Sequence, residues 1–287
     1  MMSKANLLVL CCFFVTLLSA CSSPQIEILR LGTTTSVDDS GLLDTILPDF
    51  ESQYQAKVEV IAVGTGQAIA LGRLGDVDVV LVHAASLEIP FVEAGYGEVR
   101  TPVMYNDFVI VGPNKDPALA TLALNAADLL SRIAEAQYTF VSRGDNSGTH
   151  VREQMLWRET GLTPGPQDRW YLSIGQGMGA TLNFANEEGA YTLTDRGTFL
   201  ALHENLANLE VIFKGDSPPE NPDPALRNDY SVIPINPLLH PKVNGELARS
   251  FVEWLISVPT QEMIHNFAVD RFGQPLFYPN SELWQSE

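Results

Sequence analysis

Residues 26–84 alternate strand-like and helix-like segments, and this alternation is the strongest constraint on the fold. Three of the segments are short, apolar and rich in branched side chains, as strands are: IEILRLG (26–32), KVEVIAVG (57–64) and VDVVLVHA (77–84). The stretches between them, residues 38–54 and 65–75, place apolar side chains at helical intervals. Strands that alternate with helices build a parallel sheet with helices on both faces, so we expect an α/β fold.

A second α/β unit follows, and the chain then returns to the first one. Strand-like segments over 107–113 and 230–237 are expected to connect the two units as a pair of hinge strands. The pattern therefore predicts two doubly wound α/β lobes. The boundaries we expect are residues 26–110 with 233–287 for the first lobe, and residues 111–232 for the second.

The N-terminal segment is typical of a bacterial lipoprotein signal peptide. Residues 1–20 combine an early lysine with an apolar run from Leu7 to Leu18, which is too short to span a bilayer comfortably. LSAC, ending at Cys21, resembles a lipobox, and residues 21–25 would be a tether. The alternative is an ordinary secretory signal with a chance cysteine. We expect a protein lipid-anchored to a bacterial membrane, in the periplasm or on the cell surface.

Cysteine content and charge exclude several function classes. All three cysteines lie at positions 11, 12 and 21, so the mature domain is expected to lack disulfides, cysteine metal sites and thiol nucleophiles. The net charge of −18 becomes −19 without residues 1–20, which contain one lysine and no acid. Such a surface repels nucleic acid and anionic lipid, but it leaves room for an anion in a buried site that offers local donors.

Three strand ends share one kind of turn. The turns are GTTTS (32–36), VGTGQ (63–67) and SRGDNSGT (142–149), and each leads into an expected helix. Helix N-termini present unpaired N–H groups, glycine allows close approach, and hydroxyls add uncharged donors. Arg143 adds a guanidinium that can bind an oxyanion with two parallel hydrogen bonds.

Alternatives to anion binding remain open at this point. Each turn alone is explained by helix capping, and only the set of three favours an anion site. A serine hydrolase using Ser36 or Ser147 would need a partner histidine, and the five histidines show no such arrangement. We expect His150 on the outside of its helix, and Asp195 and Arg196 as structural residues that form a local ion pair.

Several segments in order resemble the TupA-like tungstate-binding components of bacterial ABC transporters: TTTSVDDSGLLD, VIAVGTGQA, DVVLVHA, VMYNDFVIVGP, SRGDNSGTH, GQGMGATLNFANE and AYTLTDRGTFL. The resemblance spans roughly residues 26 to 275. It implies a periplasmic-binding-protein fold, capture of tungstate or molybdate without a cofactor or resident metal, and delivery to a membrane permease. We expect a monomer.

The resemblance also implies which residues line the pocket. From the first lobe these are Thr33, Thr34, Thr35, Ser36 and Thr65. From the second lobe they are Arg143, Ser147, Gly148 and Thr149.

Asp145 leaves the identity of the anion open. It resembles the acid that accepts a proton from phosphate in phosphate-binding proteins, and a tungstate site therefore predicts that Asp145 points away from the anion. A phosphate-type or sulfate-type binder, an anion-sensing module and an exported serine hydrolase are the alternatives.

Overall fold

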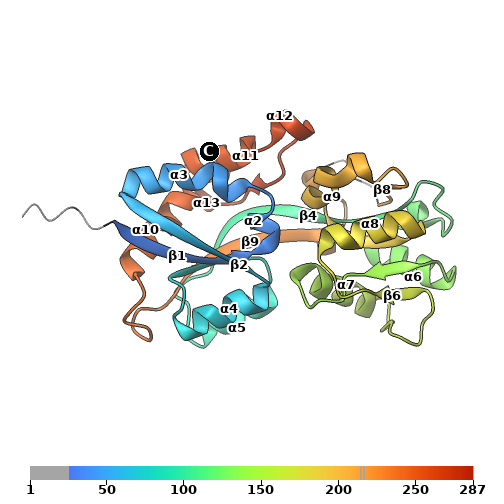
Figure 1. Ribbon diagram of the computed structural model, residues 1–287, viewed down its shortest axis with the longest axis horizontal. Coiled ribbons are helices and arrows are strands. Elements are labelled where there is room, and N and C mark those ends of the chain that lie inside the picture. Colours follow the sequence, from blue (N-terminus) through green and yellow to red (C-terminus); the bar gives the residue numbers. More distant parts are fainter. Residues whose placement is uncertain (1–25, 214, 216, 287) are drawn as a thin grey trace, which may run out of the picture.

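The computed structural model describes residues 26–213, 215 and 217–286, so the expected signal peptide, tether and Cys21 lie outside the described residues. The molecule is elongated and consists of two α/β lobes that share two long strands (Figure 1). Within the described ranges no helix is long and apolar enough to cross a membrane. The predicted α/β class with two doubly wound lobes is confirmed.

The first lobe is a sheet with helices on both faces. Strands β1 (Glu27–Thr34), β2 (Ala56–Val63) and β3 (Val79–Val82) are parallel, with β1 in the middle. Helices α3 (Leu42–Tyr54), α10 (Gly245–Ile256) and α11 (Val258–Asn266) cover one face, and α4 (Thr65–Leu74) and α5 (Ala85–Glu93) cover the other (Figure 1). Smaller elements complete the lobe: α2 (Thr35–Asp38), α12 (Val269–Phe272), β10 (Tyr278–Pro279) and α13 (Glu282–Gln285).

The second lobe repeats this arrangement. Strands β6 (Tyr171–Ser173), β5 (Phe140–Ser142) and β7 (Tyr191–Asp195) are parallel neighbours, and β8 (Leu209–Val211) pairs with the far end of β4 (Thr101–Pro113). One core lies beneath α6 (Ala126–Glu135) and α7 (Gly148–Glu159), and a second lies beneath α8 (Met178–Glu188) and α9 (Arg196–Leu202). Four short 3-10 turns complete the lobe: Ala120–Leu122, His203–Asn205, Pro218–Glu220 and Pro224–Leu226.

Strands β4 and β9 (Arg227–Pro234) run antiparallel through both lobes. Residues 101–107 of β4 pair with β9, and from Phe108 onward β4 pairs with β7 instead. Phe108 and Ile110 pack in the second lobe's core, whereas Tyr230 and Val232 pack in the first. The chain therefore changes lobe a few residues before the boundaries at 110 and 232 that the sequence suggests.

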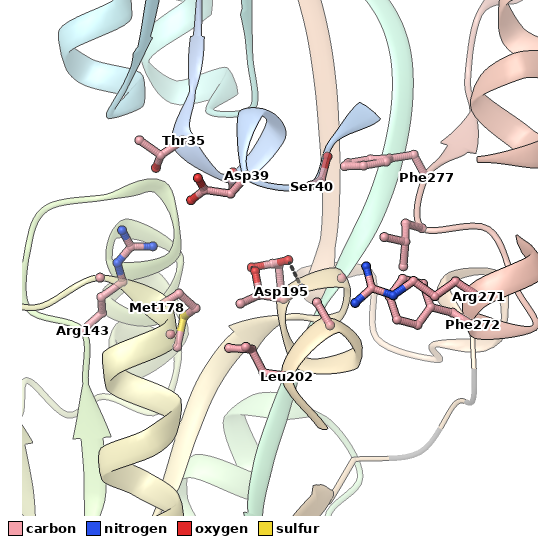
Figure 2. Close-up of a pocket in the computed structure, with 17 residues that line it drawn as sticks. Thr35, Asp39, Ser40, Arg143, Met178, Asp195, Leu202, Arg271, Phe272 and Phe277 are labelled. Carbon is pink, nitrogen blue, oxygen red and sulfur yellow. Dashed lines mark hydrogen bonds between the residues drawn. The ribbon is translucent and has the colours of Figure 1, made fainter. Parts of the chain in front are cut away.

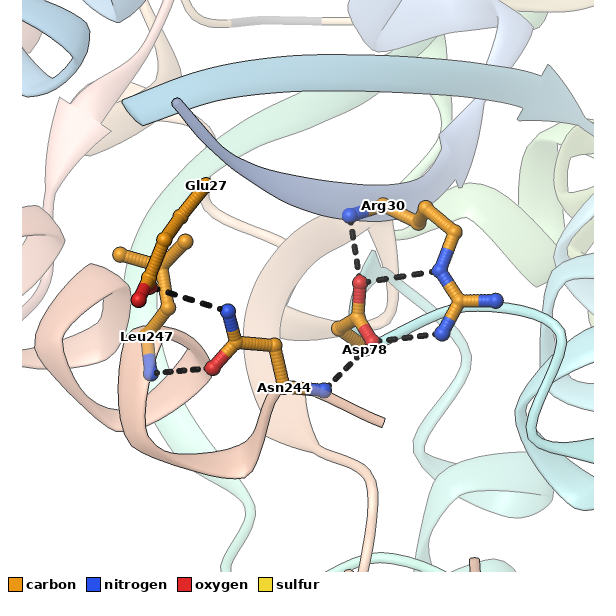
Figure 3. A network of polar contacts seen from close by, with 5 residues as sticks. All are labelled: Glu27, Arg30, Asp78, Asn244 and Leu247. Carbon is orange, nitrogen blue, oxygen red and sulfur yellow. Dashed lines mark hydrogen bonds and ion pairs between the residues drawn. The ribbon is translucent and has the colours of Figure 1, made fainter. Parts of the chain in front are cut away.

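A buried carboxylate joins three parts of the first lobe. Asp78 accepts hydrogen bonds from the backbone amide, Nε and Nη2 of Arg30 in β1, at 2.7, 3.1 and 2.7 Å. It also accepts one from the amide of Asn244, which caps α10 (Figure 3). Since Asp78 is 1% exposed and its charge is paired, this network fixes α10 on the sheet.

Candidate functional site

A cavity of about 490 Å³ lies between the lobes. The first lobe lines it with Thr35, Ser36, Asp39 and Ser40 near α2 and with Arg271, Phe272, Leu276 and Phe277 near α12. The second lobe contributes Arg143, residues 177–179, Asp195, Gly197, Thr198, Ala201 and Leu202. Figure 2 shows Thr35 and Asp39 facing Arg143 and Met178 across the gap. The threonine-rich turn (residues 32–36) and the arginine turn (residues 142–149) therefore meet at one cavity.

The threonine-rich turn ends β1 and enters α2, and only part of it faces the cavity. Thr33 is fully buried, and its hydroxyl donates to the Leu81 carbonyl oxygen at 2.9 Å. The hydroxyls of Thr34 and Ser36 lie 3.1 Å apart and share a hydrogen bond. Thr35 is exposed and lines the cavity, as does Ser36. The Thr33 hydroxyl therefore donates within the sheet and stabilises the fold, while the hydroxyls of Thr35 and Ser36 can donate to a ligand.

The arginine turn is held by contacts within its own loop. Arg143 Nε donates to Asp145 Oδ2 at 2.8 Å, and Asp145 Oδ1 accepts from the Ser147 amide at 3.1 Å. Gly144 adopts a φ of +67°, and a Cβ there would lie 2.0 Å from Ser173 Oγ, so only glycine fits. Burial acts to raise the pKa of Asp145, but hydrogen bonds from Ser147 and the Arg143 charge outweigh it and lower that pKa. Asp145 is therefore an ionised carboxylate that orients Arg143.

Helix α7 begins where the two lobes touch. Ser147 is its N-cap and accepts from the His150 amide at 3.3 Å, and Thr149 is buried. Gly148 is the first helical residue, and a Cβ there would lie 2.7 Å from His83 Cε1 in the first lobe. The absence of a side chain at Gly148 thus lets the start of α7 approach the first lobe closely.

Thr65 opens α4 and is 2% exposed, and its Oγ1 has no hydrogen-bond partner among the described residues. A buried hydroxyl without a partner costs free energy, which a bound acceptor would recover.

A neutral polar chain joins His83 to the hinge strands. His83 Nδ1 lies 2.7 Å from Asn228 Oδ1, and Asn228 Nδ2 donates to Asn106 Oδ1 at 2.7 Å and to the Tyr230 hydroxyl at 3.1 Å. Burial, with a smaller effect of the nearby Arg152 and Arg143 charges, lowers the pKa of His83 to about 4. His83 is therefore neutral at physiological pH, and its Nδ1 donates to Asn228.

Asp195 is the buried carboxylate of the cavity wall. Its oxygens accept from the amide of Thr198 at 2.8 Å and from its hydroxyl at 2.7 Å, so it caps α9. Burial raises the pKa of Asp195 even though these hydrogen bonds and the Arg143 charge oppose the change.

Comparison with known proteins identifies the family. Residues 20–258 match the family described as PBP superfamily domain. The tungstate-binding protein TupA of Peptoclostridium acidaminophilum is 44% identical over 253 residues, which cover 88% of this chain and 85% of that protein. The solved TupA from Desulfovibrio alaskensis G20 aligns with a TM-score of 0.78 and 44% identity, over 89% of this chain and 100% of that one.

A solved structure described as the tungstate ABC transporter from Geobacter sulfurreducens aligns with a TM-score of 0.72 at 46% identity, over 83% of this chain and 97% of that one. The chain belongs to the TupA family of the PBP superfamily. The resemblance inferred from the sequence motifs is thereby confirmed.

Some of the residues expected at the site line the cavity of this TupA-family chain, and others do not. Thr35, Ser36 and Arg143 line the cavity directly. The remaining expected residues lie in the same three turns without lining it: Thr33, Thr34, Thr65, Ser147, Gly148 and Thr149.

Sequence reasoning did not select several cavity residues of this TupA-family chain. Gly177 and Met178 form the start of α8, whose GQGMG segment carries no anion-binding signal beyond the family resemblance. Asp195 was interpreted as structural, and it does cap α9, but it also faces the cavity. Arg271, Phe272, Leu276 and Phe277 carry no motif, so no signal in a single sequence points to them.

Two expectations are wrong. Arg196 does not pair with Asp195; its Nε and Nη2 donate to Asp107 of β4 at 2.8 and 2.6 Å, because β4 and α9 meet where the chain changes lobe. His150 is not on the outside of its helix; it is 6% exposed, and its Nδ1 accepts from the Asn146 amide at 2.9 Å.

Proposed function

We propose that this protein captures tungstate outside the cytoplasm and delivers it to the permease of an ABC transporter. The observation that carries the proposal is the single cavity lined by the Thr35–Ser36 turn of one lobe and Arg143 of the other. Membership of the TupA family supports the choice of ligand. The protein acts by binding and release and is not an enzyme.

The physical basis of binding is replacement of the anion's water shell by fixed donors. The Thr35 and Ser36 hydroxyls and the Arg143 guanidinium line the cavity and supply the first donors. The Thr65 hydroxyl and the amides that open α7 lie in the neighbouring turns and supply further donors when the lobes close. Hydrogen bonds to charged groups are worth about 1.5–3 kcal/mol each. Roughly six of them suffice for nanomolar affinity, which corresponds to about −12 kcal/mol.

Closure about β4 and β9 brings the donors together. The two strands are the connection between the lobes, and in the open cleft a dianion contacts the donors of one lobe first. Rotation about this hinge then seals the anion between the threonine-rich turn and Arg143. The closed form is the one that docks on the permease.

Asp145 supports a fully deprotonated anion over phosphate. Both of its carboxylate oxygens accept hydrogen bonds from Arg143 and Ser147, and it does not line the cavity. It is therefore not placed to accept the proton that hydrogen phosphate carries. Molybdate has the same charge and shape as tungstate and is the second candidate ligand.

The remaining features of the proposal concern location and assembly. The protein is anchored through a lipid on Cys21 to a bacterial membrane, in the periplasm or at the cell surface, and works as a monomer. Palmitate labelling of the expressed full chain, compared with a Cys21→Ser variant, tests the anchor, and sedimentation of the soluble domain tests the monomer.

Competitive titration calorimetry of the soluble domain tests the ligand. Tungstate and molybdate should bind with nanomolar affinity, and sulfate and phosphate should fail to displace them at millimolar concentration. Preferential binding of phosphate would refute the proposal, and so would absence of binding by all four anions.

A further inference from the structure

Glu153 is a buried carboxylate that the binding site does not use. It lies on α7, one helical turn after Thr149, and is 2% exposed. None of the ion pairs among the described residues includes it. Burial of an ionisable group without a cation is costly, so Glu153 calls for an explanation in terms of its neighbours.

The neighbours of Glu153 are neutral donors, and one of them belongs to the arginine turn. Its Oε1 accepts from the Tyr171 hydroxyl at 2.7 Å and from Trp157 Nε1 at 3.2 Å. The backbone amide of Arg143, in the turn over residues 142–149, lies near this carboxylate. Glu153 thus joins β6 to α7 beside the turn that presents the guanidinium to the cavity.

We propose that Glu153 is the positioning residue beneath the anion-binding turn, and that capture of the dianion is coupled to uptake of a proton by its carboxylate. This inference rests on the proposed function. Glu153 lies on the same helix as Thr149, one turn further on, and is buried, so a dianion held by Arg143 and the start of α7 would act on it with little water to screen the charge. Two negative groups at that spacing disfavour each other, so the bound anion favours the neutral acid.

The free protein is poised for this exchange near neutral pH. Burial raises the pKa of Glu153 to about 7, although hydrogen bonds from Tyr171 and Trp157 oppose the change. Bound dianion raises the pKa further. Affinity is therefore constant below pH 7 and falls above it, because binding then requires a proton from solution.

Other charged groups on the elements packed against Glu153 do not reproduce this profile. His150 on α7 has a pKa lowered by burial, and Asp145 has a lowered pKa, so neither changes charge above pH 7. Arg143 is paired with Asp145, and Arg132 of α6 is paired with Asp128. Arg152 of α7 donates to the carbonyl oxygens of Ala225 and Arg227, and burial raises the pKa of Tyr171, so its hydroxyl stays neutral over this range. Asp195 of β7 has a raised pKa and lies on the cavity wall, so it is the one group that the experiment must separate from Glu153.

Calorimetry with sodium tungstate from pH 6.5 to 9, in buffers of different ionisation enthalpy, measures both affinity and protons taken up. We expect uptake of up to about one proton per anion at pH 8, and a dissociation constant that rises up to about tenfold per pH unit above pH 7. Glu153→Gln should abolish the uptake and flatten the profile. Glu159→Gln, an exposed position on the same helix, should leave the wild-type profile unchanged.

Two further variants keep the outcome decisive. Tyr171→Phe retains the carboxylate but removes a hydrogen bond that lowers its pKa, so the break should move to higher pH. Asp195→Asn should keep the proton uptake of the wild type, and loss of the uptake in this variant would assign it to Asp195 and overturn the inference. Equal uptake in wild type and Glu153→Gln would overturn the inference, as would a flat wild-type profile. Failure of the wild type to bind tungstate at pH 6.5 would instead refute the proposed function.

Discussion

Replacing Arg143 by alanine is the sharpest test of the two-lobed site. Arg143 Nε is engaged by Asp145, whereas Nη1 and Nη2 donate no hydrogen bond to any of the described residues. Those two nitrogens remain for the ligand and suit a pair of parallel hydrogen bonds to one oxyanion. The side chain is 13% exposed, so the bonds form in a region of low dielectric.

The expected loss follows from these contacts. Two charge-assisted hydrogen bonds are worth about 3–6 kcal/mol together, which corresponds to a loss of about two to four orders of magnitude in affinity. The variant also leaves the Asp145 carboxylate without its cation, which adds repulsion toward the dianion. Calorimetric titration of Arg143→Ala with tungstate measures the loss directly.

Control variants separate the guanidinium from its surroundings. Arg143→Ala combined with Asp145→Asn should recover part of the affinity, because the unpaired carboxylate is gone. Arg143→Lys should retain a point charge but lose the paired geometry, and so bind between wild type and Arg143→Ala. A change smaller than threefold in Arg143→Ala, with unfolding temperature preserved, would refute the role assigned to this side chain.

Three further predictions follow from particular contacts. Thr65→Val should weaken tungstate binding about tenfold with little effect on stability, since its Oγ1 has no partner within the described chain. Thr33→Val should instead cost about 1 kcal/mol of unfolding free energy, because it loses the hydrogen bond to the Leu81 carbonyl oxygen. Calorimetry and denaturant unfolding of both variants measure these effects, and the reverse assignment would contradict the prediction. Gly148→Ala should impair closure and weaken tungstate binding, because its Cβ would lie 2.7 Å from His83 in the first lobe; an affinity equal to that of the wild type would show that this close contact is dispensable. Between pH 5 and pH 8 the wild type should lose roughly 2 kcal/mol of unfolding free energy relative to Glu153→Gln, because its unfolded Glu153 ionises over this range while the folded carboxyl, with a pKa of about 7, keeps its proton up to that pH. Parallel pH profiles of the two proteins in urea unfolding would exclude this.

The architecture was predictable because parallel strands that are buried on both faces appear in the sequence as continuous apolar segments. Val79, Val80, Leu81 and Val82 of β3 are all at most 1% exposed, as a continuous apolar segment requires. The lobe boundaries were less predictable. Strand β4 continues through both lobes, and its pairing changes from β9 to β7 between Asp107 and Phe108 without ending the strand, so no turn marks the boundary.

The site was predictable as far as strand-end chemistry reaches. Donor-rich turns after β1, β2 and β5 could be found because glycines, hydroxyls and an arginine follow apolar strands directly. The sequence does not reveal which hydroxyl of a turn faces the cavity, because that depends on the neighbouring strand. The Thr33 hydroxyl, for example, donates its hydrogen bond to the Leu81 carbonyl oxygen of β3. Nor does the sequence reveal partners such as Asp107 for Arg196, since those residues are far apart in the chain.

The balance of charge within the cavity explains how so acidic a chain can hold an anion. Asp39 and Asp195 line the cavity together with Arg143 and Arg271, so the formal charges of its walls cancel. Backbone N–H groups and the Arg143 guanidinium can only donate, so they favour oxygen atoms that carry no protons of their own. Hydrogen phosphate that turned its hydroxyl toward one of these donors would leave both groups without an acceptor, a penalty of about 1–3 kcal/mol for each unpaired group. The donor-only groups therefore disfavour protonated oxyanions, while the lack of net formal charge on the walls leaves total affinity to the completeness of closure around β4 and β9.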